Sequence, residues 1–254
     1  MLYPRIIPCL TVDEYGDMVK TTNFDYDSRR YIGDIENAVK IFNEKKVDEI
    51  IVLDIAASKK KLEPKYDMIE KIAFSCRMPF SYGGGIKNFN QVKKIINLGV
   101  EKIILNSIVF ENINLVKEIS NYYGAQSVAV CLDIFYVNGE IQLLTQSGKK
   151  YYNKKDLLDL IKKIQNNGSG ELIINSVDRD GTMSGYNLDY IENFYQIIST
   201  PLTLLGGAGK LNHFLEVKEK IQISGLAAGS FFIYKSKKKG ILINYPNKKE
   251  IFKL

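Results

Sequence analysis

Residues that commonly bind metals or act as catalytic bases are scarce in this chain of 254 residues. It has a single histidine, His213, and three cysteines, Cys9, Cys76 and Cys131, without a Cys-x-x-Cys pair. A Ser-His-Asp triad, a histidine-based metal site, a zinc site and a disulfide framework are therefore not indicated. We expect no metal and no other cofactor.

Long apolar runs are also missing. No segment approaches the roughly 20 residues of a membrane-spanning helix, and the first ten residues do not form a secretory signal. We therefore expect a cytoplasmic protein with no membrane partner. The net charge of +6 comes largely from lysine-rich stretches such as Lys59–Lys61 and Lys235–Lys239, without the interleaved aromatics that base stacking requires, so nucleic acid is not an expected partner.

What the sequence does contain is an alternation of strand-like and helix-like segments. The expected strands are Ile6–Leu10, Glu49–Asp54, Pro79–Gly83, Lys102–Asn106, Ser127–Asp133, Glu171–Ser176, Leu202–Gly206 and Gly225–Ala228. The expected helices are Asp34–Asn43, Tyr66–Cys76, Asn90–Leu98, Asn114–Tyr123, Lys154–Asn167, Leu188–Ile198 and Leu211–Ile221. Eight such units predict an α/β protein, a single (β/α)₈ TIM barrel domain spanning residues 1–254.

The two halves of the chain resemble each other at an offset of about 122 residues. Cys9–Thr11 corresponds to Cys131–Asp133, and Tyr82–Lys87 corresponds to Leu205–Lys210. A repeat of half the chain length predicts two half-barrels of four strands each. A doubly wound open sheet would not require such a repeat, so the barrel is favoured.

Glycine-rich segments follow the third and the seventh expected strands. The carboxyl ends of barrel strands form the functional face, and glycines there let backbone N–H groups approach an anion at the start of a helix. Two phosphate sites are therefore predicted, one in each half, made by Gly84, Gly85, Asn106, Ser107, Gly207, Ala208, Gly229 and Ser230. They imply a small substrate with a phosphate at each end; the alternative is that the glycines only terminate strands.

Acidic residues at the same strand ends are candidates for chemistry. Asp133 ends the fifth strand, where a carboxylate can serve as general acid or base. Asp54 follows the second strand, and Asp180 with Gly181 lies in a polar segment after the sixth. For the polar segment after the sixth strand, a helix cap or a turn stabilised by side-chain hydrogen bonds is the competing interpretation.

Two polar residues lie in the loop after the first strand. Lys20 and Asn23 can meet a substrate phosphate or hydroxyl from there. His213 falls within a helix, where a structural role is the better interpretation.

Several motifs together resemble the cyclase-subunit family of imidazole glycerol phosphate synthase. They are MLYPRIIPCL, VKTTNF, DEIIVLDIAAS, YGGGI, VEKIILNS, SVAVCLDI, NSVDRDGTMSGY and LGGAGKLNHF, and they cover essentially the whole chain. The resemblance implies a heterodimer in which a glutaminase subunit docks at the amino-terminal face of the barrel. Ammonia then crosses the barrel and attacks a bisphosphorylated ribulosyl aminoimidazole carboxamide at the opposite mouth.

The resemblance also implies a gate of four charged residues at the barrel floor, carried over onto Arg5, Glu49, Lys102 and Glu171. A structural salt-bridge ring is the plainer interpretation, and both can hold at once.

One departure from the family concerns its two catalytic acids. Asp133 matches the second, but Thr11 stands at the first, and a threonine hydroxyl is not an anionic base near neutral pH. Asn175, Leu205 and the tail Ile241–Pro246 also depart from the histidine-pathway pattern. These departures resemble a branch associated with surface-polysaccharide sugar amidation.

Three functions are therefore weighed. The first is a cyclase-type lyase subunit. The second is an altered relative that conducts ammonia to a sugar amidotransferase, and the third is a stand-alone isomerase of the sister barrel family. Thr11 and the gate both count against the isomerase.

Overall fold

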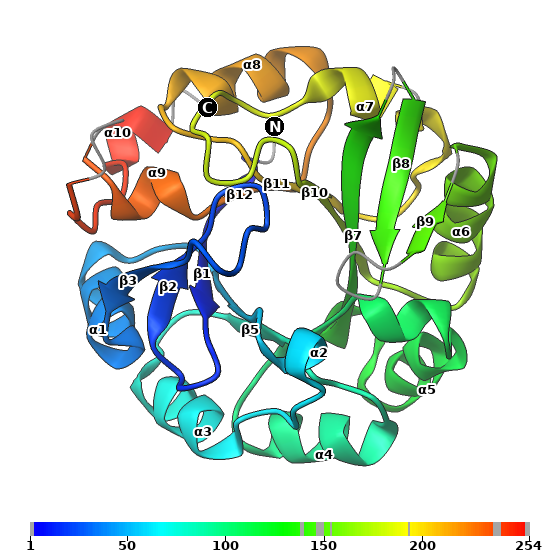
Figure 1. Ribbon diagram of the computed structural model, residues 1–254, viewed down its shortest axis with the longest axis horizontal. Coiled ribbons are helices and arrows are strands. Elements are labelled where there is room, and N and C mark those ends of the chain that lie inside the picture. The colour runs from blue at the N-terminus through cyan, green and yellow to red at the C-terminus, as the bar shows by residue number, and fades with distance from the viewer. Residues whose placement is uncertain are drawn as a thin grey trace.

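Eight parallel strands close into a barrel surrounded by helices in the computed structural model (Figure 1). The structure describes residues 3–137, 140–145, 150–152, 154–192, 194–235 and 240–251. The barrel strands are β1 (Arg5–Val12), β4 (Ile50–Asp54), β5 (Phe80–Gly83), β6 (Lys102–Leu105), β7 (Val128–Val137), β10 (Glu171–Ser176), β11 (Leu202–Leu205) and β12 (Gly225–Ala228). Pairing of β7 with β10 and of β12 with β1 completes the cylinder, so the predicted barrel class is confirmed.

Helices connect these strands or follow the last of them, and all but the short second helix lie in the outer ring (Figure 1). They are α1 (Ile35–Lys45), α2 (Ala57–Lys60), α3 (Tyr66–Ser75), α4 (Phe89–Asn97), α5 (Asn114–Tyr123), α6 (Lys154–Asn166), α7 (Leu188–Glu192), α8 (Asn212–Lys220), α9 (Ser230–Ile233) and α10 (Lys248–Ile251). Polar caps fix where several begin: Asp34 accepts a hydrogen bond from the Asn37 N–H at 2.8 Å, and Asn88 forms a capping box with Gln91.

Two hairpins and one interruption depart from the predicted pattern. β2 (Met18–Lys20) pairs antiparallel with β1, and β3 (Arg30–Gly33) pairs with β2. In the same way β8 (Glu140–Thr145) pairs antiparallel with β7, and β9 (Lys150–Tyr152) pairs with β8. The predicted helix Leu188–Ile198 is wrong in its length, because α7 ends at Glu192 and a 3₁₀ turn occupies Tyr195–Ile197. Within the described ranges, every helix is too short or too polar to cross a membrane.

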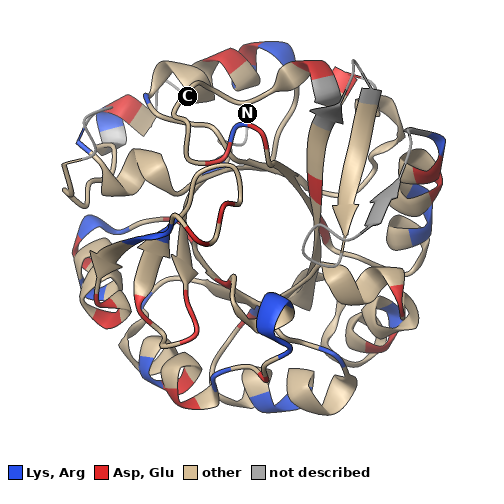
Figure 2. Ribbon diagram, in the orientation of Figure 1, with Lys and Arg blue, Asp and Glu red and all other residues tan. Residues whose placement is uncertain are grey.

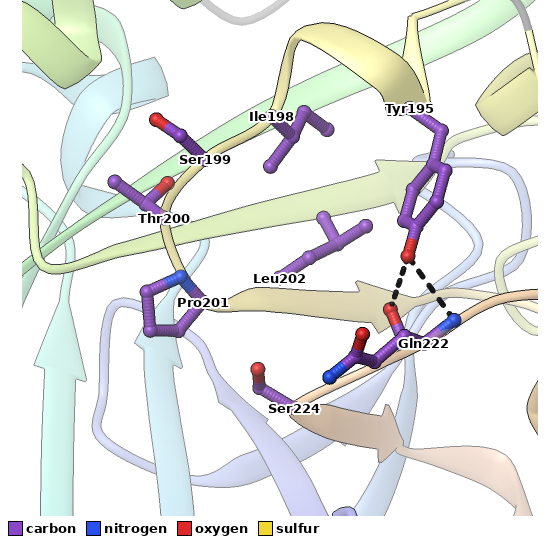
Figure 3. A pocket seen from close by; sticks show the side chains of 8 residues that line it. All are labelled: Tyr195, Ile198, Ser199, Thr200, Pro201, Leu202, Gln222 and Ser224. Atoms are coloured by element: carbon purple, nitrogen blue, oxygen red, sulfur yellow. Dashed lines mark hydrogen bonds between the residues drawn. The ribbon is translucent and has the colours of Figure 1, made fainter.

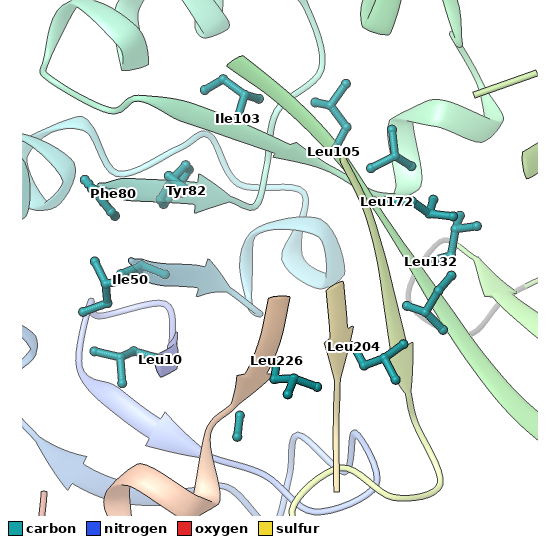
Figure 4. Close-up of a cluster of buried hydrophobic side chains, with 14 of the residues drawn as sticks. Leu10, Ile50, Phe80, Tyr82, Ile103, Leu105, Leu132, Leu172, Leu204 and Leu226 are labelled. Atoms are coloured by element: carbon teal, nitrogen blue, oxygen red, sulfur yellow. The ribbon is translucent and has the colours of Figure 1, made fainter. Parts of the chain in front are cut away.

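Side chains along each barrel strand alternate between two apolar layers, because successive residues of a strand point to opposite faces. One layer packs between strands and helices and includes Leu10, Ile50, Phe80, Tyr82, Ile103, Leu105, Leu132, Leu172, Leu204 and Leu226 (Figure 4). The other faces the barrel axis, and we call it the lumen cluster: Ile7, Cys9, Ile51, Ile104, Ala129, Cys131, Ile173, Leu205 and Ala227. The axis-facing positions before and after this cluster hold the polar groups described next.

Candidate functional site

Four charged side chains form a closed ring at the amino ends of the barrel strands. Arg5 pairs with Glu49 and lies 2.8 Å from a Glu171 oxygen. The Lys102 Nζ lies 3.0 Å from Glu49 and 2.7 Å from Glu171. The structure thus brings together the four residues that the sequence comparison suggested as a gate, and we call them the floor ring.

The charges of the floor ring stabilise one another. Burial alone would raise the pKa of Glu171, but Lys102 and Arg5 beside it hold that pKa below its ordinary value. Burial likewise disfavours the charged form of Arg5, and the two glutamates outweigh this effect, so the pKa of Arg5 is raised. The floor of the barrel is therefore a plug of paired charges.

Between floor and mouth, the barrel axis is lined by the lumen cluster. Its two thiols are buried, and burial raises the pKa of Cys9 to about 12 and that of Cys131 well above its ordinary value. Both thiols are therefore neutral at physiological pH. A small neutral molecule on this path meets no charged side chain among the residues of the lumen cluster.

Asp133 stands at the mouth end of the axis with both carboxylate oxygens held. Asn106 donates its amide N–H to Oδ2 and Asn175 donates to Oδ1, each at 2.9 Å. Burial raises the pKa of Asp133 to about 6; the two amides lower it and Asp180 raises it further. A carboxyl group that titrates this close to neutrality is suited to take up and return protons.

Thr11 occupies the corresponding place in the first half of the barrel. It is buried, and its hydroxyl donates a hydrogen bond to the carbonyl of Val19, its partner in the β1–β2 ladder. The threonine therefore anchors a hairpin. Asp133 faces the mouth without a second carboxylate at position 11.

The first glycine of each loop makes the same close approach in both halves. Gly84 has φ +130°, and a Cβ there would lie 2.6 Å from the Asp54 carbonyl oxygen; Gly206 has φ +91°, and a Cβ there would lie 2.7 Å from the Ser176 oxygen. A side chain at either position would collide with the preceding strand. Among the hydrogen bonds found in the described residues, none uses the backbone N–H of Gly84, Gly85, Gly207 or Ala208. Backbone N–H groups that are not used within the protein can bind an anion.

A buried lysine of β2, in the first half of the chain, reaches the end of β12 in the second half. Lys20 is 5% exposed, and its Nζ lies 2.3 Å from the position that a Cβ at Gly229 would take. The Ser230 hydroxyl beside it is buried and has no hydrogen-bond partner in the described structure. Ser107 begins a 3₁₀ turn at the equivalent strand end of the first half. Lys20, Gly229 and Ser230 thus converge on one position at the mouth.

Other residues singled out from the sequence are engaged within the protein. The Asp54 carboxylate accepts hydrogen bonds from the N–H groups of Ala56 and Ala57 at 3.0 and 2.9 Å and pairs with Lys65. The backbone N–H of Asn23 donates to the Asp180 carbonyl at 2.9 Å. These contacts hold the loops at the mouth in place.

Gly181 and His213 hold the loops around the second glycine segment. Gly181 has φ +74°, and a Cβ there would lie 2.4 Å from the Thr21 carbonyl oxygen. A glycine at this position therefore lets the loop after β2 pack closely against it. His213 is buried, and its Nδ1 accepts the Gly209 N–H at 3.1 Å. This contact agrees with the structural role expected for the histidine.

The rim of the mouth is tied together by a cluster of charged and aromatic side chains. Glu14, in the loop after β1, pairs with Lys60 of α2 and accepts a hydrogen bond from Tyr26. Arg29 lies 3.3 Å from Glu14 and 4.4 Å from the centre of the Tyr26 ring. The short helix α2 is the basic turn beside the opening in Figure 2. We call Glu14, Tyr26, Arg29 and Lys60 the rim cluster.

A cavity of about 260 Å³ lies at the amino ends of β11 and β12, away from the mouth (Figure 3). Tyr195 forms one wall, and its hydroxyl donates to the Gln222 carbonyl at 3.0 Å. The Ser224 carbonyl at its edge accepts two hydrogen bonds from Arg5, from the backbone N–H at 3.0 Å and from Nε at 3.3 Å. This cavity belongs to the floor of the barrel.

Sequence reasoning missed three contributors to these sites. Ser81 and Thr203 donate their hydroxyls to the floor-ring glutamates, and Asn175, noted only as a departure, donates to Asp133. The repeat could have suggested the hydroxyl pair, since Ser81 and Thr203 are separated by the repeat offset.

The chain is thus a (β/α)₈ barrel with a charged floor, an apolar axis and two glycine loops around one carboxylate. Residues 5–238 match the model of the histidine biosynthesis protein family, and the chain belongs to that family.

Named relatives agree with this assignment. The chain is 48% identical over 249 residues to a putative imidazole glycerol phosphate synthase subunit HisF of Leptospira borgpetersenii, covering 97% of this chain and 96% of that protein. It is 37% identical over 250 residues to the putative subunit hisF2 of Pseudomonas aeruginosa, with 97% of each covered. It is 38% identical over 232 residues to the subunit HisF of a Thermotoga species, with 91% and 90% covered.

Proposed function

We propose that this protein is a cyclase-type subunit of a glutamine-dependent amidotransferase. Ammonia made by a glutaminase subunit enters through the floor, crosses the lumen cluster and reacts at the mouth with a bisphosphorylated ribulosyl aminoimidazole-type substrate. The observation that carries this proposal is the order of groups along the axis: the paired charges at Glu49 and Glu171, then apolar side chains, then Asp133.

The floor is the proposed docking face for the glutaminase. Its ring is closed by contacts within this chain, so ammonia passes only after a cation of the ring separates from a carboxylate. A docked subunit can supply the contacts that compensate for that separation. The lumen cluster then favours neutral ammonia over ammonium, because an unpaired charge in an apolar passage is strongly disfavoured.

At the mouth, the glycine loops and Lys20 hold the two phosphates. Backbone N–H groups near Gly84 and Gly207 bind phosphate oxygens, and the Lys20 ammonium adds a positive charge beside Gly229. Asp133, ionised at neutral pH, accepts a proton from the attacking nitrogen and returns it to a leaving group. Asn106 and Asn175 each hold one of its two oxygens in place.

A second candidate function rests on Thr11. With its hydroxyl donated to Val19, the first half of the mouth supplies no acid or base from this position. The barrel would then conduct ammonia without closing the imidazole ring and pass it to another enzyme, such as a sugar amidotransferase.

Purified protein tests both candidates. The chain is mixed with the glutaminase encoded in its own genome, and complex formation and glutamine hydrolysis are measured. We expect a heterodimer and faster hydrolysis. A chain that neither binds nor activates that glutaminase would contradict both candidates.

A substitution at Thr11 then separates them. A general acid–base group typically contributes 10²–10⁴-fold, so with ammonium and the ribulosyl substrate the native chain should turn over slowly and Thr11→Asp faster. Thr11→Val is the matched control, because it removes the bond to Val19 without adding a carboxylate. Native turnover unchanged by either substitution, and as fast as that of the Thermotoga relative assayed alongside, would favour the first candidate. A Thr11→Asp variant that binds the substrate but shows no turnover would favour the second candidate.

A further inference from the structure

Each glutamate of the floor ring is held by a hydroxyl as well as by two cations. Ser81 on β5 donates to Glu49 at 2.7 Å, and Thr203 on β11 donates to Glu171. Glu49 directly precedes β4 and Glu171 begins β10, and in both cases the hydroxyl comes from the next strand of the barrel. Ser81 and Thr203 are 1% and 0% exposed, so solvent does not compete for either bond.

The Thr203 hydroxyl depends on a glycine in the neighbouring strand. Thr203 and Gly225 are directly paired between β11 and β12. A Cβ at Gly225 would lie 2.1 Å from the Thr203 Oγ1 and 3.1 Å from Ile7 Cδ1. Because Gly225 does not have the positive φ that calls for glycine, the space it leaves explains its presence.

We infer that Thr203, seated against Gly225, is a positioning residue that fixes the Glu171 carboxylate to the barrel wall. Opening of the floor then separates the cations from carboxylates that stay in place. This inference refines the proposed ammonia path, but its physical content, a hydroxyl that holds a buried carboxylate, does not require a glutaminase.

The fixed carboxylate has a measurable property. The pKa of Glu171 lies below its ordinary value because Lys102 and Arg5 outweigh burial, and a hydroxyl donor adds to the stabilisation of the ionised form. Removing the donor should therefore raise the pKa of Glu171 toward the ordinary range. Restoring a hydroxyl should reverse the change.

Carbon-13 NMR titration of glutamate-labelled full-length protein tests this. We expect Thr203→Val to shift the Glu171 titration to higher pH and Thr203→Ser to restore it. Gly225→Ala should shift it in the same direction while leaving Thr203 in place, because the added methyl displaces the hydroxyl. Thr200→Val is the matched control, since the Thr200 hydroxyl is buried near the floor without a partner in the described structure.

Two results would overturn the inference: an unchanged Glu171 titration in Thr203→Val, or the same shift in Thr200→Val. If Thr203→Val does not fold, Gly225→Ala and Thr203→Ser decide between the same outcomes. With a bound glutaminase and an active chain, Thr203→Val should also lower glutamine-driven turnover relative to ammonium-driven turnover. If the native chain does not bind a glutaminase, the proposed function is refuted, but the NMR test of Thr203 still stands.

Discussion

The floor and the mouth of this barrel treat the internal repeat differently. At the floor, Glu49 with Ser81 is matched by Glu171 with Thr203, and both pairs make the same contacts. At the mouth, the glycine turns keep the repeat, but Asp133 is opposed by Thr11, whose hydroxyl is donated to the main chain.

This difference separates the floor ring, which closes one end of the barrel, from the residues at the mouth that are proposed to act in the reaction. At the floor, each half supplies one carboxylate with its hydroxyl, while both cations, Arg5 and Lys102, come from the first half. At the mouth the two halves supply different groups, Asp133 from the second half and Thr11 from the first. Replacing residues at the two ends should therefore have different consequences, for activity at the mouth and for stability at the floor.

The largest expected effect is at the mouth. Asp133→Asn should lower ammonium-driven turnover by about 10²–10⁴-fold if Asp133 moves the proton. The fold should be unharmed: the pKa of Asp133 is raised to about 6, so its ionised form costs stability at neutral pH and a neutral amide removes that cost. Turnover and the melting temperature are measured together. Equal turnover, or a collapse of the melting temperature, would contradict this role.

At the floor, the expected effect is on stability. Lys102→Met leaves two buried carboxylates with one cation, and breaking such a buried pair typically costs about 3–5 kcal/mol of unfolding free energy. Urea unfolding measures this loss. Lys59→Met is the control, because its pair with Asp27 is exposed and such pairs contribute about 0–1 kcal/mol. Equal losses in both variants would show that the floor ring is not a coupled unit.

The pH dependence of the floor follows from Glu171. Its folded pKa is below the ordinary value, so its contribution to stability is complete above that value and is lost as the pH falls through the folded pKa. The Lys102→Met variant should therefore lose less stability on acidification than the native chain.

The barrel strands could be predicted because β-branched segments recur at regular spacing and repeat between halves. The hairpin β2–β3 could not, since Met18–Lys20 is too short for a periodic pattern and depends on pairing with β1. The position of Asp133 followed from the repeat. Its partner Asn175 did not, because a single amide at the end of an apolar strand has no pattern of its own.

An intermediate effect is expected where those amides meet Asp133. Asn175→Leu removes one donor, so the pKa of Asp133 should rise above about 6. The acid limb of the pH–rate profile should move to higher pH with it, because the base must ionise before it acts. A profile that stays in place would mean that Asn106 alone positions the carboxylate.

The smallest expected effect is at the rim cluster, where the contacts lie near the surface. Lys60→Met removes the cation paired with Glu14, and pairs of this kind contribute about 0–1 kcal/mol, so the unfolding free energy should change little. Locally the effect should be larger, because Glu14 also holds Tyr26 and Arg29 and so connects the loop after β1 to α2. Hydrogen exchange across residues 14–29 should therefore accelerate while the barrel strands stay protected.

Acid should have the same local effect as Lys60→Met. Lys60 and Tyr26 lower the pKa of Glu14 to about 2, so the cluster is complete above the ordinary pKa of a glutamate and comes apart as the pH falls toward 2. Lys40→Met on α1, outside the rim cluster, is a suitable control for loss of a lysine. Exchange in residues 14–29 that matches this control would mean that the mouth keeps its shape through Asn23, Asp180 and Gly181 alone. The mouth would then resemble the floor in depending on buried contacts, and the contrast between the two ends would be confined to their chemistry.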